Sequence, residues 1–555
     1  MMIKTKRVSN LLGTHFYNIL DKLILVAVIS LVMTFILYPI ASVIMESFIV
    51  DGKLTLDIYM NLFNKSTKLF YNSIFVAILT TVISTFMSVC ISLYISFSGK
   101  RIRKVLLLVL MLTMISPPFV SSLAYITLFG RRGFIIHNIL GLTMNTYGWQ
   151  GIVAMQSLGF TSLSALILVG VINGIDKNFI KSSLDLGASS SYTVRKIVLP
   201  LMKPGILVVA LLTFVRSLSD FGTPTIIGGA FNVLATQAYL DVIAYADLNA
   251  ASAISVLIFV PAIIAFLFYR VFMARTNMAS TNALVGFTEE DEMTIDDFLG
   301  KFIKIITYFF LTIMLLQYIS IFVSAFTKYR SGNMYFSLEN IQNMRIYSGK
   351  SFLRSILYAL IAAIGGSLIG SLIAYYLEIR RIKIMKGIDF IATIPYIIPG
   401  TFFGIGYILA FNDYPLELTG TALIVIFNVL FKQLPMSTKI NSAVLSQINP
   451  QIEQAAKDLG GQDFFVLKDI IIPMSRSALL VSFINNFTAT MTTIGSIIFL
   501  IYPGKKLATI EMFDAIQSGN YGVGSAIAVT IILITLAVNI TFSKFVLEGK
   551  NVFRN

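Results

Sequence analysis

Charged residues are scarce in this sequence. Asp, Glu, Lys and Arg make up 12% of its 555 residues, whereas 56% are hydrophobic and the mean hydropathy is +0.83. A soluble protein carries about 25% charged residues, so a soluble multidomain enzyme is excluded. Disorder is excluded because the chain has ample apolar surface to bury, and the single cysteine, Cys90, excludes an internal disulfide scaffold. The composition indicates a polytopic membrane protein.

Catalytic and metal-binding sets are missing as well. The only histidines, His15 and His137, lie far apart and have no cysteine partners, so they do not suggest a metal site. No Ser-His-Asp or paired-carboxylate arrangement appears, and no Gly-x4-Gly-Lys-Ser/Thr phosphate-binding loop occurs. We therefore expect no catalytic residue, no bound metal and no cofactor held by this chain.

Long apolar runs fill most of the sequence. A membrane-crossing helix needs about 20 predominantly apolar residues, and the runs predict an all-α membrane protein with about twelve such helices. They lie at residues 23–45, 69–99, 105–130, 149–172, 204–227, 248–269, 305–327, 355–377, 390–412, 418–438, 477–504 and 518–543. Charge interrupts two of them, at Arg216 and Asp220 in the fifth and at Lys432 in the tenth.

The distribution of basic residues predicts the orientation. With both termini in the cytoplasm, 28 of the 42 Lys and Arg residues fall on the cytoplasmic side and 12 on the outer side. Cytoplasmic segments of membrane proteins carry this excess of positive charge. The net charge of +15 therefore needs no nucleic-acid partner and is explained by insertion into a lipid bilayer.

Two long cytoplasmic loops repeat each other. The first reads Lys181-Ser-Ser-Leu-Asp-Leu-Gly187 and then Ile197-Val-Leu-Pro200, and the second reads Gln454-Ala-Ala-Lys-Asp-Leu-Gly460 and then Ile470-Ile-Ile-Pro473. Corresponding residues differ by 273 in number. Such internal repeats are typical of transporters.

The repeat divides the chain into two tandem halves of six helices each. We predict a first half at 1–275 with its loop at 177–203, a linker at 276–300, and a second half at 301–555 with its loop at 448–476. Six helices per half give both halves the same orientation. The linker is acidic, with Asp296 and Asp297 among its residues, and is interpreted as a solvated cytoplasmic connection.

Each loop has the residues of two short helices at a tight bend. Gly187 and Gly460 suit a helix C-cap, and Pro200 and Pro473 suit the first turn of the next helix. The loops are either structural connectors or docking elements for a cytoplasmic partner. Two nearly equal copies favour docking, because a two-fold partner needs two equivalent surfaces.

The loops resemble the EAA motif of permease subunits of binding-protein-dependent ABC importers, most closely at Glu453-Gln-Ala-Ala-Lys-Asp-Leu-Gly460. The family pattern has Glu directly before two alanines, where this chain has Gln454 and Lys181, and Glu453 could substitute from one residue earlier. The resemblance implies that the loops couple to an ATPase subunit through these residues: Lys181, Ser182, Ser183, Asp185, Gly187, Pro200, Glu453, Gln454, Ala455, Ala456, Asp458, Gly460 and Pro473.

A narrower resemblance concerns the cargo. Ser219-Asp-Phe-Gly-Thr-Pro-Thr-Ile-Ile-Gly-Gly229 and the residues after it look like fused two-half permeases of the ferric-iron type. This resemblance implies a bacterial inner-membrane permease for ferric iron, two copies of a cytoplasmic ATPase that uses the ATP, and a periplasmic or lipid-anchored solute-binding protein. Alternatives are the same permease class for 2-aminoethylphosphonate, phosphorylated sugar, thiamine or polyamine, or a secondary transporter.

Polar and helix-breaking residues within the helices are candidates for the translocation path. Arg216 and Asp220 lie four residues apart and so share one helix face, as a structural pair, as a gate or as a substrate contact. Prolines inside helices free backbone carbonyls, which indicates either packing kinks or an unwound gate. Tyrosine oxygens suit a hard cation such as ferric iron, although packing is the simpler role. The candidate residues are Arg216, Asp220, Pro118, Tyr125, Pro399, Tyr407, Asn485 and Asn486, with Asn485 and Asn486 taken as the counterpart of the charged pair.

Overall fold

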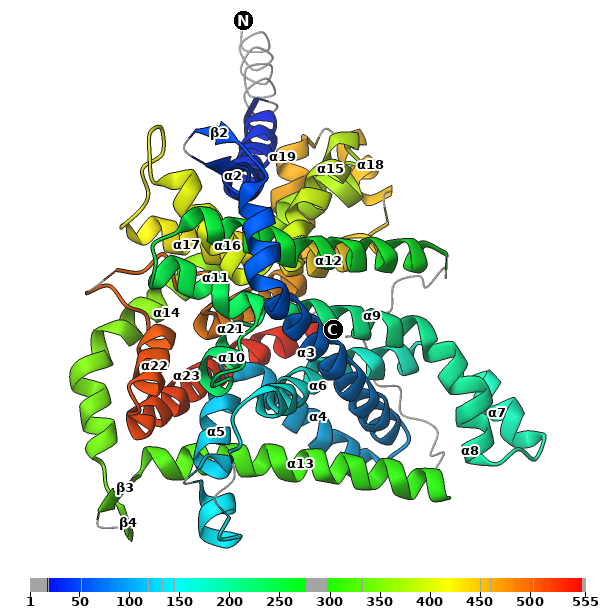
Figure 1. The fold of residues 1–555 in the computed structure, drawn as a ribbon. Coiled ribbons are helices and arrows are strands. Elements are labelled where there is room, and N and C mark those ends of the chain that lie inside the picture. Colours follow the sequence, from blue (N-terminus) through cyan, green and yellow to red (C-terminus); the bar gives the residue numbers. More distant parts are fainter. Residues whose placement is uncertain are drawn as a thin grey trace, which may run out of the picture. The chain divides into compact units, whose positions relative to one another are not determined.

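The computed structural model describes residues 17, 19–50, 52–117, 119–131, 133–142, 145–275, 297–330, 333–449, 451–459, 461–502 and 504–551. Ten helices within these ranges are long and apolar enough to cross a membrane. An eleventh crossing is possible as a pair, Lys383–Tyr396 with Gly400–Phe411, bent by 114° at its break. The prediction of an all-α polytopic membrane protein is confirmed (Figure 1).

The chain forms two compact units that do not follow the two halves of the sequence. Unit 1 contains Met1–Met45, Leu353–Gly504 and Ile534–Asn555, and unit 2 contains Glu46–Phe352 and Lys505–Leu533. Two long helices, α14 and α23, begin in unit 2 and continue in unit 1. The half boundaries at 275 and 301 remain a prediction from the sequence repeat.

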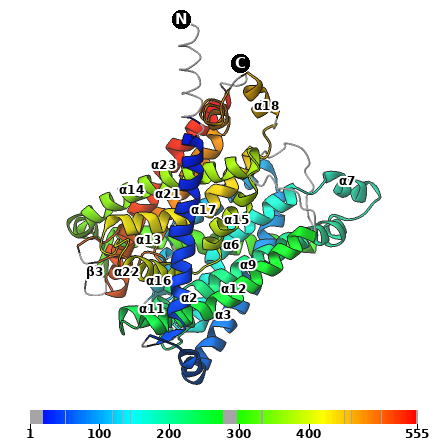
Figure 2. The ribbon, with the colours of Figure 1, turned by 90° about the horizontal axis from the view of Figure 1, so that it is seen from above.

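Unit 2 carries most helices of the first half and two short antiparallel hairpins. Its elements are β1 (Ile49–Val50), β2 (Lys53–Leu54), α3 (Asp57–Ser96), α4 (Lys100–Ile115), α5 (Phe119–Phe129), η2 (Phe134–Ile139), α6 (Trp149–Asn173), α7 (Lys177–Asp185), α8 (Ser190–Thr193), η3 (Val194–Val198), α9 (Leu199–Ser219), α10 (Gly222–Ile227), α11 (Leu234–Ile243), α12 (Leu248–Arg275), α13 (Phe298–Ala325), β3 (Thr327–Arg330), β4 (Asn333–Phe336) and α22 (Ala508–Gln517), with the first parts of α14 (Glu339–Ala374) and α23 (Tyr521–Asn551). In Figure 2, α7 projects at one end of these helices.

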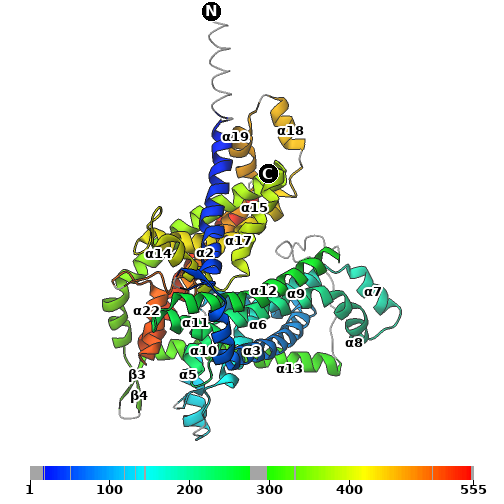
Figure 3. The same ribbon diagram turned by 45° about the horizontal axis from the view of Figure 1, so that its top comes forward.

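Unit 1 carries the first membrane helix together with most helices of the second half. That helix runs over Ile19–Glu46 and includes η1 and α2. The elements are η1 (Met33–Leu37), α2 (Tyr38–Glu46), η4 (Tyr375–Ile379), α15 (Lys383–Thr393), η5 (Ile394–Tyr396), α16 (Gly400–Phe411), α17 (Ala422–Leu445), α18 (Gln451–Asp458), α19 (Asp463–Phe465), η6 (Val466–Ile471), α20 (Ile472–Met474) and α21 (Arg476–Thr492). Figure 3 shows α18 and α19 beside the first helix.

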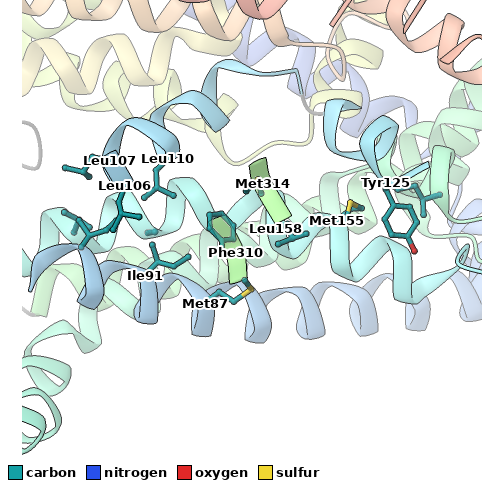
Figure 4. Packing of buried hydrophobic residues seen from close by; sticks show 14 residues of the cluster. Met87, Ile91, Leu106, Leu107, Leu110, Tyr125, Met155, Leu158, Phe310 and Met314 are labelled. Carbon is teal, nitrogen blue, oxygen red and sulfur yellow. The ribbon is translucent and has the colours of Figure 1, made fainter. Parts of the chain in front are cut away.

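The core of unit 2 joins helices of both sequence halves. Phe310 and Met314 of α13 pack against Met87 of α3 and Met155 and Leu158 of α6 (Figure 4). All five side chains are at most 8% exposed, so their burial contributes about 1.5–3 kcal/mol for each residue. The first helix of the second half is therefore part of the core around the first-half helices.

In unit 1, conversely, a helix of the first half packs among helices of the second half. The Phe35 ring of the first membrane helix lies 5.4 Å from the Phe411 ring and 5.1 Å from the Phe431 ring, between centroids. The hydroxyl of Tyr407 donates a hydrogen bond to the Phe35 carbonyl over 2.8 Å. The first helix of the chain thus packs on α16 and α17, which belong to the second half.

Four predicted helices are not continuous. The run at 390–412 is interrupted by the break between Tyr396 and Gly400 described above. The run at 105–130 is divided into α4 and α5, because Ser116 before Pro117 takes an extended conformation. The run at 204–227 ends as a helix at Ser219, and the run at 477–504 ends at Thr492. Hydropathy reports apolar length only, so it does not locate these ends.

Candidate functional site: coupling loops and translocation path

The first repeated loop bends sharply after α7. Gly187 has a φ of +84°, which glycine adopts without strain. The Ala188 N–H donates to the Ser183 carbonyl over 3.1 Å, and the Gly187 N–H donates to the Leu184 carbonyl over 2.9 Å. These are the bonds of a Schellman cap, so Gly187 ends the helix as its position predicts.

The second loop repeats this cap. The Gly461 N–H donates to the Ala456 carbonyl over 2.9 Å, and this bond lies 273 residues after its counterpart in the first loop. Gly460, predicted to end the helix, lies outside the described residues. The repeat in sequence is therefore also a repeat in backbone hydrogen bonding.

A wide helical turn leads each loop into the following helix. The π-helical segments η3 and η6 come directly before the helical turns that contain Pro200 and Pro473. Proline cannot donate a backbone hydrogen bond, and a π-turn is a regular way to accommodate a missing bond. In the first loop the helical backbone is then continuous over Ser190–Ser219.

The two loops expose the same face. Leu186 and Leu459, which correspond in the repeat, are 89% and 90% exposed and are the most exposed large apolar residues that the structure describes. Ser183 is buried and Ala456 is half-buried, so both turn inward. The exposed loop faces consist of Lys181, Ser182, Asp185 and Leu186 in the first loop and Gln454, Ala455, Asp458 and Leu459 in the second.

Glu453 turns away from the exposed loop face. It is 9% exposed, its Oε1 lies 2.6 Å from the Nζ of Lys457, and the same oxygen lies 3.9 Å from the Nε of Arg380. Gln454 holds the exposed position next to it. The geometry therefore favours Glu453 as an anchor of the loop rather than as a substitute for the family's glutamate.

The first loop has a different anchor. The Ser183 and Thr193 hydroxyl oxygens lie 2.8 Å apart, and the Ser191 N–H donates to the Asp297 Oδ2 over 3.3 Å. Hydrogen bonding from Ser191 holds the pKa of the Asp297 carboxyl below its ordinary value. Asp297 lies in the predicted acidic linker, and this hydrogen bond ties that residue to the first loop. The other linker acids lie outside the described residues.

The predicted pair of Arg216 and Asp220 does not form. α9 ends at Ser219, and Asp220 has an extended conformation, so the two residues no longer share a helix face. The Asp220 Oδ2 accepts a hydrogen bond from the Gln156 Nε2 over 2.9 Å, and its Oδ1 accepts bonds from two backbone N–H groups that follow it. Arg216 is exposed, and no ion pair joins it to Asp220.

Gln156 completes a buried polar group that sequence reasoning missed. Its Oε1 accepts hydrogen bonds from Ser217 over 2.6 Å and from Thr80 over 3.2 Å. The group ties the end of α9 to α6 and α3. A glutamine within an apolar run was the available signal, because a buried amide requires partners.

The counterpart of Asp220 also differs from the prediction. α9 ends at Ser219 and α21 at Thr492, again 273 residues apart, so Asp220 corresponds to Thr493. Asn486 instead packs on α17, where its Nδ2 lies 2.7 Å from the Ser437 Oγ. Asn485 is half-buried. The helix ends, rather than shared polarity, decide which residues correspond.

Lys432 is a second residue whose role the sequence did not reveal. Its Nζ donates hydrogen bonds to the Pro395 and Ile398 carbonyls, each over 2.6 Å. Pro399 lacks the N–H that would donate to the Pro395 carbonyl in a continuous helix. The ammonium of Lys432 therefore satisfies the acceptors that the break between η5 and α16 leaves open.

The tyrosines proposed for the path have internal partners. The Tyr125 hydroxyl donates to the Thr146 carbonyl over 2.6 Å, and Tyr407 is bound to Phe35 as described above. Their burial favours packing over contact with a cation. Pro118 lies outside the described residues, and Pro399 comes directly before α16.

A model of one protein family matches both halves of the chain. It is the binding-protein-dependent transport system inner membrane component, and it matches residues 88–278 and 366–546. The chain belongs to this family. The two matches include the two repeated loops and confirm that the chain is a fused permease with two copies of the domain.

Two relatives of this permease align over most of its length, and a third aligns over a smaller part. The ferric transport system permease protein FbpB of Actinobacillus pleuropneumoniae is 26% identical over 94% of this chain and 78% of the relative. A Haemophilus influenzae protein, provisionally named ferric transport system permease protein FbpB 1, is 27% identical over 86% of this chain and 77% of the relative. A Salmonella typhimurium protein provisionally named 2-aminoethylphosphonate transport system permease PhnV is 25% identical over 34% of this chain and 70% of the relative.

Family membership determines the class of activity. The chain is a multi-pass inner-membrane permease of an ABC importer, a transport component rather than an enzyme. Permeases of this family work with a solute-binding protein and an ATPase. The alternative of a secondary transporter is therefore excluded.

Proposed function

We propose that this permease imports ferric iron, which a periplasmic or lipid-anchored binding protein delivers, and that two copies of an ATPase dock on its two loops. The cargo is supported by the two relatives whose names specify ferric transport and which align over 94% and 86% of the chain. The relative named for 2-aminoethylphosphonate aligns over only 34%. The chain itself binds no cofactor, and ATP is used by the partner.

The aspartate and the leucine that both exposed loop faces share carry the docking proposal. Each face places a leucine at a bend, with about nine-tenths of its surface exposed, beside an aspartate that also corresponds in the repeat. An apolar side chain at such a tip gains stability when a partner's pocket covers it. Two faces that share this aspartate and leucine fit two copies of one subunit, which supports a count of two ATPase copies.

The orientation follows from the same assignment. ATP is available in the cytoplasm, so both loops and both termini lie on the cytoplasmic side. The excess of 28 basic residues on that side over 12 on the other supports this orientation.

A mechanism follows from the continuity of the first loop. When ATP binding closes the ATPase subunits, the displacement of α8 is carried along Ser190–Ser219, since this segment is one helical body. At its far end, Asp220 is bound to Gln156 of α6. A movement of the loop therefore reaches the neighbouring membrane helix through a hydrogen-bonded contact.

The decisive experiment measures cargo and docking separately. Uptake of radiolabelled ferric iron is measured at limiting iron in cells with and without the chain, and co-purification of the ATPase is measured with tagged permease. Leu186→Glu and Leu459→Glu should together reduce co-purified ATPase at least about tenfold, because a charge then enters an apolar pocket. Leu54→Glu is the matched control, since Leu54 is 83% exposed in the hairpin of β1 and β2.

Each result removes one part of the proposal. Unchanged iron uptake after deletion excludes ferric iron, and 2-aminoethylphosphonate, phosphorylated sugar, thiamine and polyamine are then tested in the same assay. Full retention of the ATPase by the double leucine variant excludes docking at the loops, whatever the cargo.

A further inference from the structure

We propose that Arg380 is a positioning residue that locks the second loop to the first membrane helix, so that the two move as one body during transport. This inference rests on the proposed docking of an ATPase at that loop. It assigns a role to a residue that sequence reasoning counted only as part of the basic charge on the cytoplasmic side.

Arg380 joins three segments that are far apart in the sequence. It follows η4 directly and is 19% exposed at its side chain. Its Nη1 lies 3.3 Å from the Asp21 Oδ2, its Nη2 lies 2.9 Å from the Asp463 Oδ2, and its Nε lies 3.9 Å from the Glu453 Oε1. One planar guanidinium thus reaches the first helix, α18 and α19, which a lysine with its single ammonium could not do equally well.

The carboxylates of this cluster have further partners. Lys457 lies 2.6 Å from Glu453 and 3.0 Å from Asp463, measured from its Nζ to the carboxylate oxygens. The Tyr376 hydroxyl donates to the Asp21 Oδ1 over 3.0 Å. Asp21 is 8% exposed at its side chain, so its interactions with Arg380 and Tyr376 are shielded from water and salt.

Aromatic packing reinforces the same contact. The Tyr17 ring lies 4.6 Å from the Phe465 ring and 5.8 Å from the Phe464 ring, between centroids. Both phenylalanines belong to α19 in the second loop. The first helix and the loop therefore meet through an ionic and an apolar surface, beside each other in Figures 1 and 3.

The first membrane helix, which Arg380 joins to the second loop, also contacts α16, the helix that follows the break in the second half. The first helix continues from Asp21 to Phe35, and the Phe35 carbonyl accepts the hydrogen bond of Tyr407 in α16. A displacement of the second loop is thus transmitted through Arg380 to the first helix and through that helix to α16. This route does not depend on α21, which starts only after the short helix α20.

Among the residues that the structure describes, no arginine forms an ion pair with Asp297 in the way that Arg380 does with Asp21. The first loop contacts the start of α13 through the hydrogen bond from Ser191 to Asp297, whose acceptor lies 276 residues after Asp21, and through apolar packing of Val194 and Val198 in the cluster that contains Ile303. Both loops therefore hold an aspartate at the start of the other half's first helix, but only the second does so through a shielded cluster of charges. The two loops are predicted to differ in rigidity.

The experiment compares Arg380→Gln, Arg380→Lys and Asp21→Asn with Arg381→Gln in the complete importer reconstituted in lipid vesicles. Arg381 is the matched control because it is the adjacent arginine and is exposed. Hydrogen exchange is followed in residues 451–474, with residues 177–198 of the same protein as the internal reference. ATP hydrolysis stimulated by the iron-loaded binding protein is measured in parallel.

Arg380→Gln and Asp21→Asn should each accelerate exchange in 451–474 by about tenfold and leave 177–198 unchanged, because a shielded charge loses its partner. Stimulated ATP hydrolysis should fall at least about fivefold in each of these two variants. A variant that combines Arg380→Gln and Asp21→Asn should lose no more hydrolysis than the more severe single variant, because both substitutions remove the same contact. Arg380→Lys should give intermediate rates of hydrogen exchange and of stimulated ATP hydrolysis. Arg381→Gln should leave both rates as they are in the unchanged protein. Unchanged exchange after Arg380→Gln overturns the lock.

Two results separate this inference from the proposed function. Faster exchange in 451–474 with fully stimulated hydrolysis overturns the positioning role of Arg380 while docking stands. Retention of the ATPase by the leucine variants overturns docking at the loops while the exchange experiment still reports whether the lock exists.

Discussion

At the scale of single residues, Lys432 shows how one side chain stabilises a broken membrane helix. Its ammonium donates to two carbonyls at the break before α16. A charge inside a membrane protein is retained only where the surrounding structure satisfies it. Here two carbonyls and the face of Phe403, whose ring centroid lies 5.7 Å from the Nζ, provide that environment.

Lys432→Met should destabilise the permease. Each buried acceptor left without a donor costs about 1–3 kcal/mol, and two are affected. We expect a clearly lower melting temperature of the purified permease in detergent. Lys439→Met in the same helix is the control, because Lys439 is exposed and its pair with Asp389 belongs to the weak surface class. Equal melting temperatures for the two variants would contradict this role.

Arg216 and Asp220 should respond differently to substitution. Asp220→Ala leaves the amide of Gln156 and two backbone N–H groups without their acceptor, which should cost about 3 kcal/mol or more. Arg216→Gln should change stability by no more than about 0.5 kcal/mol, since Arg216 is exposed. Thermal unfolding of both variants measures the difference. Similar losses for both would support the ion pair that the sequence suggested.

At the scale of elements, the loop bends depend on backbone conformation more than on space. A Cβ at Gly187 would meet no atom within 4 Å, yet its φ of +84° is unfavourable for other residues. Gly187→Ala should therefore loosen the cap of α7 at a cost of about 1–2 kcal/mol. Faster hydrogen exchange of the Ala188 amide would report this loosening.

Gly159→Ala provides the comparison for Gly187→Ala. Gly159 lies inside α6 and also has no atom within 4 Å of an added Cβ, but its φ is not positive. Alanine is favoured over glycine within a helix by about 1 kcal/mol, so this variant should be neutral or more stable. The same loss in both variants would mean that the conformation of Gly187 is unimportant.

The ends of the membrane helices were the elements least accessible to sequence reasoning. Pro117 gave a correct signal for the break between α4 and α5. The end of α21 at Thr492 had no proline signal, and the apolar run simply continued. After α21 ends, the chain packs closely on the start of α16. A Cβ added to Gly400, the first residue of α16, would lie 2.9 Å from the Gly495 backbone. That contact exists only in the folded protein.

At the scale of the whole molecule, neither half of the sequence is a compact unit by itself. α13 is part of the core of unit 2, and the first membrane helix packs within unit 1. Two chains cut in the linker, 1–285 and 286–555, should each be unstable when produced alone and should co-purify when produced together. A protease-resistant 1–285 fragment alone would contradict this expectation.

Sequence reasoning predicted the structure best where the prediction depended on the composition or on the internal repeat. The all-α membrane class followed from apolar length, and both loops were found because 273-residue spacing joins glycine, proline and isoleucine in two places. It failed for Arg216 and Asp220, because four-residue spacing means proximity only while a helix continues. Sequence reasoning could not assign roles to Arg380, Gln156 or Lys432, because their partners lie on other helices. Gln156, for example, is 64 residues from Asp220.

The sequence by itself determined the membrane class, the two tandem halves and the two repeated loops, because length, hydropathy and residue spacing are properties of the chain. The tertiary structure alone decided which acids Arg380 holds, which carbonyls Lys432 satisfies and which helices the first and seventh membrane segments join. These are contacts between residues distant in sequence, and their geometry is defined only when helices pack.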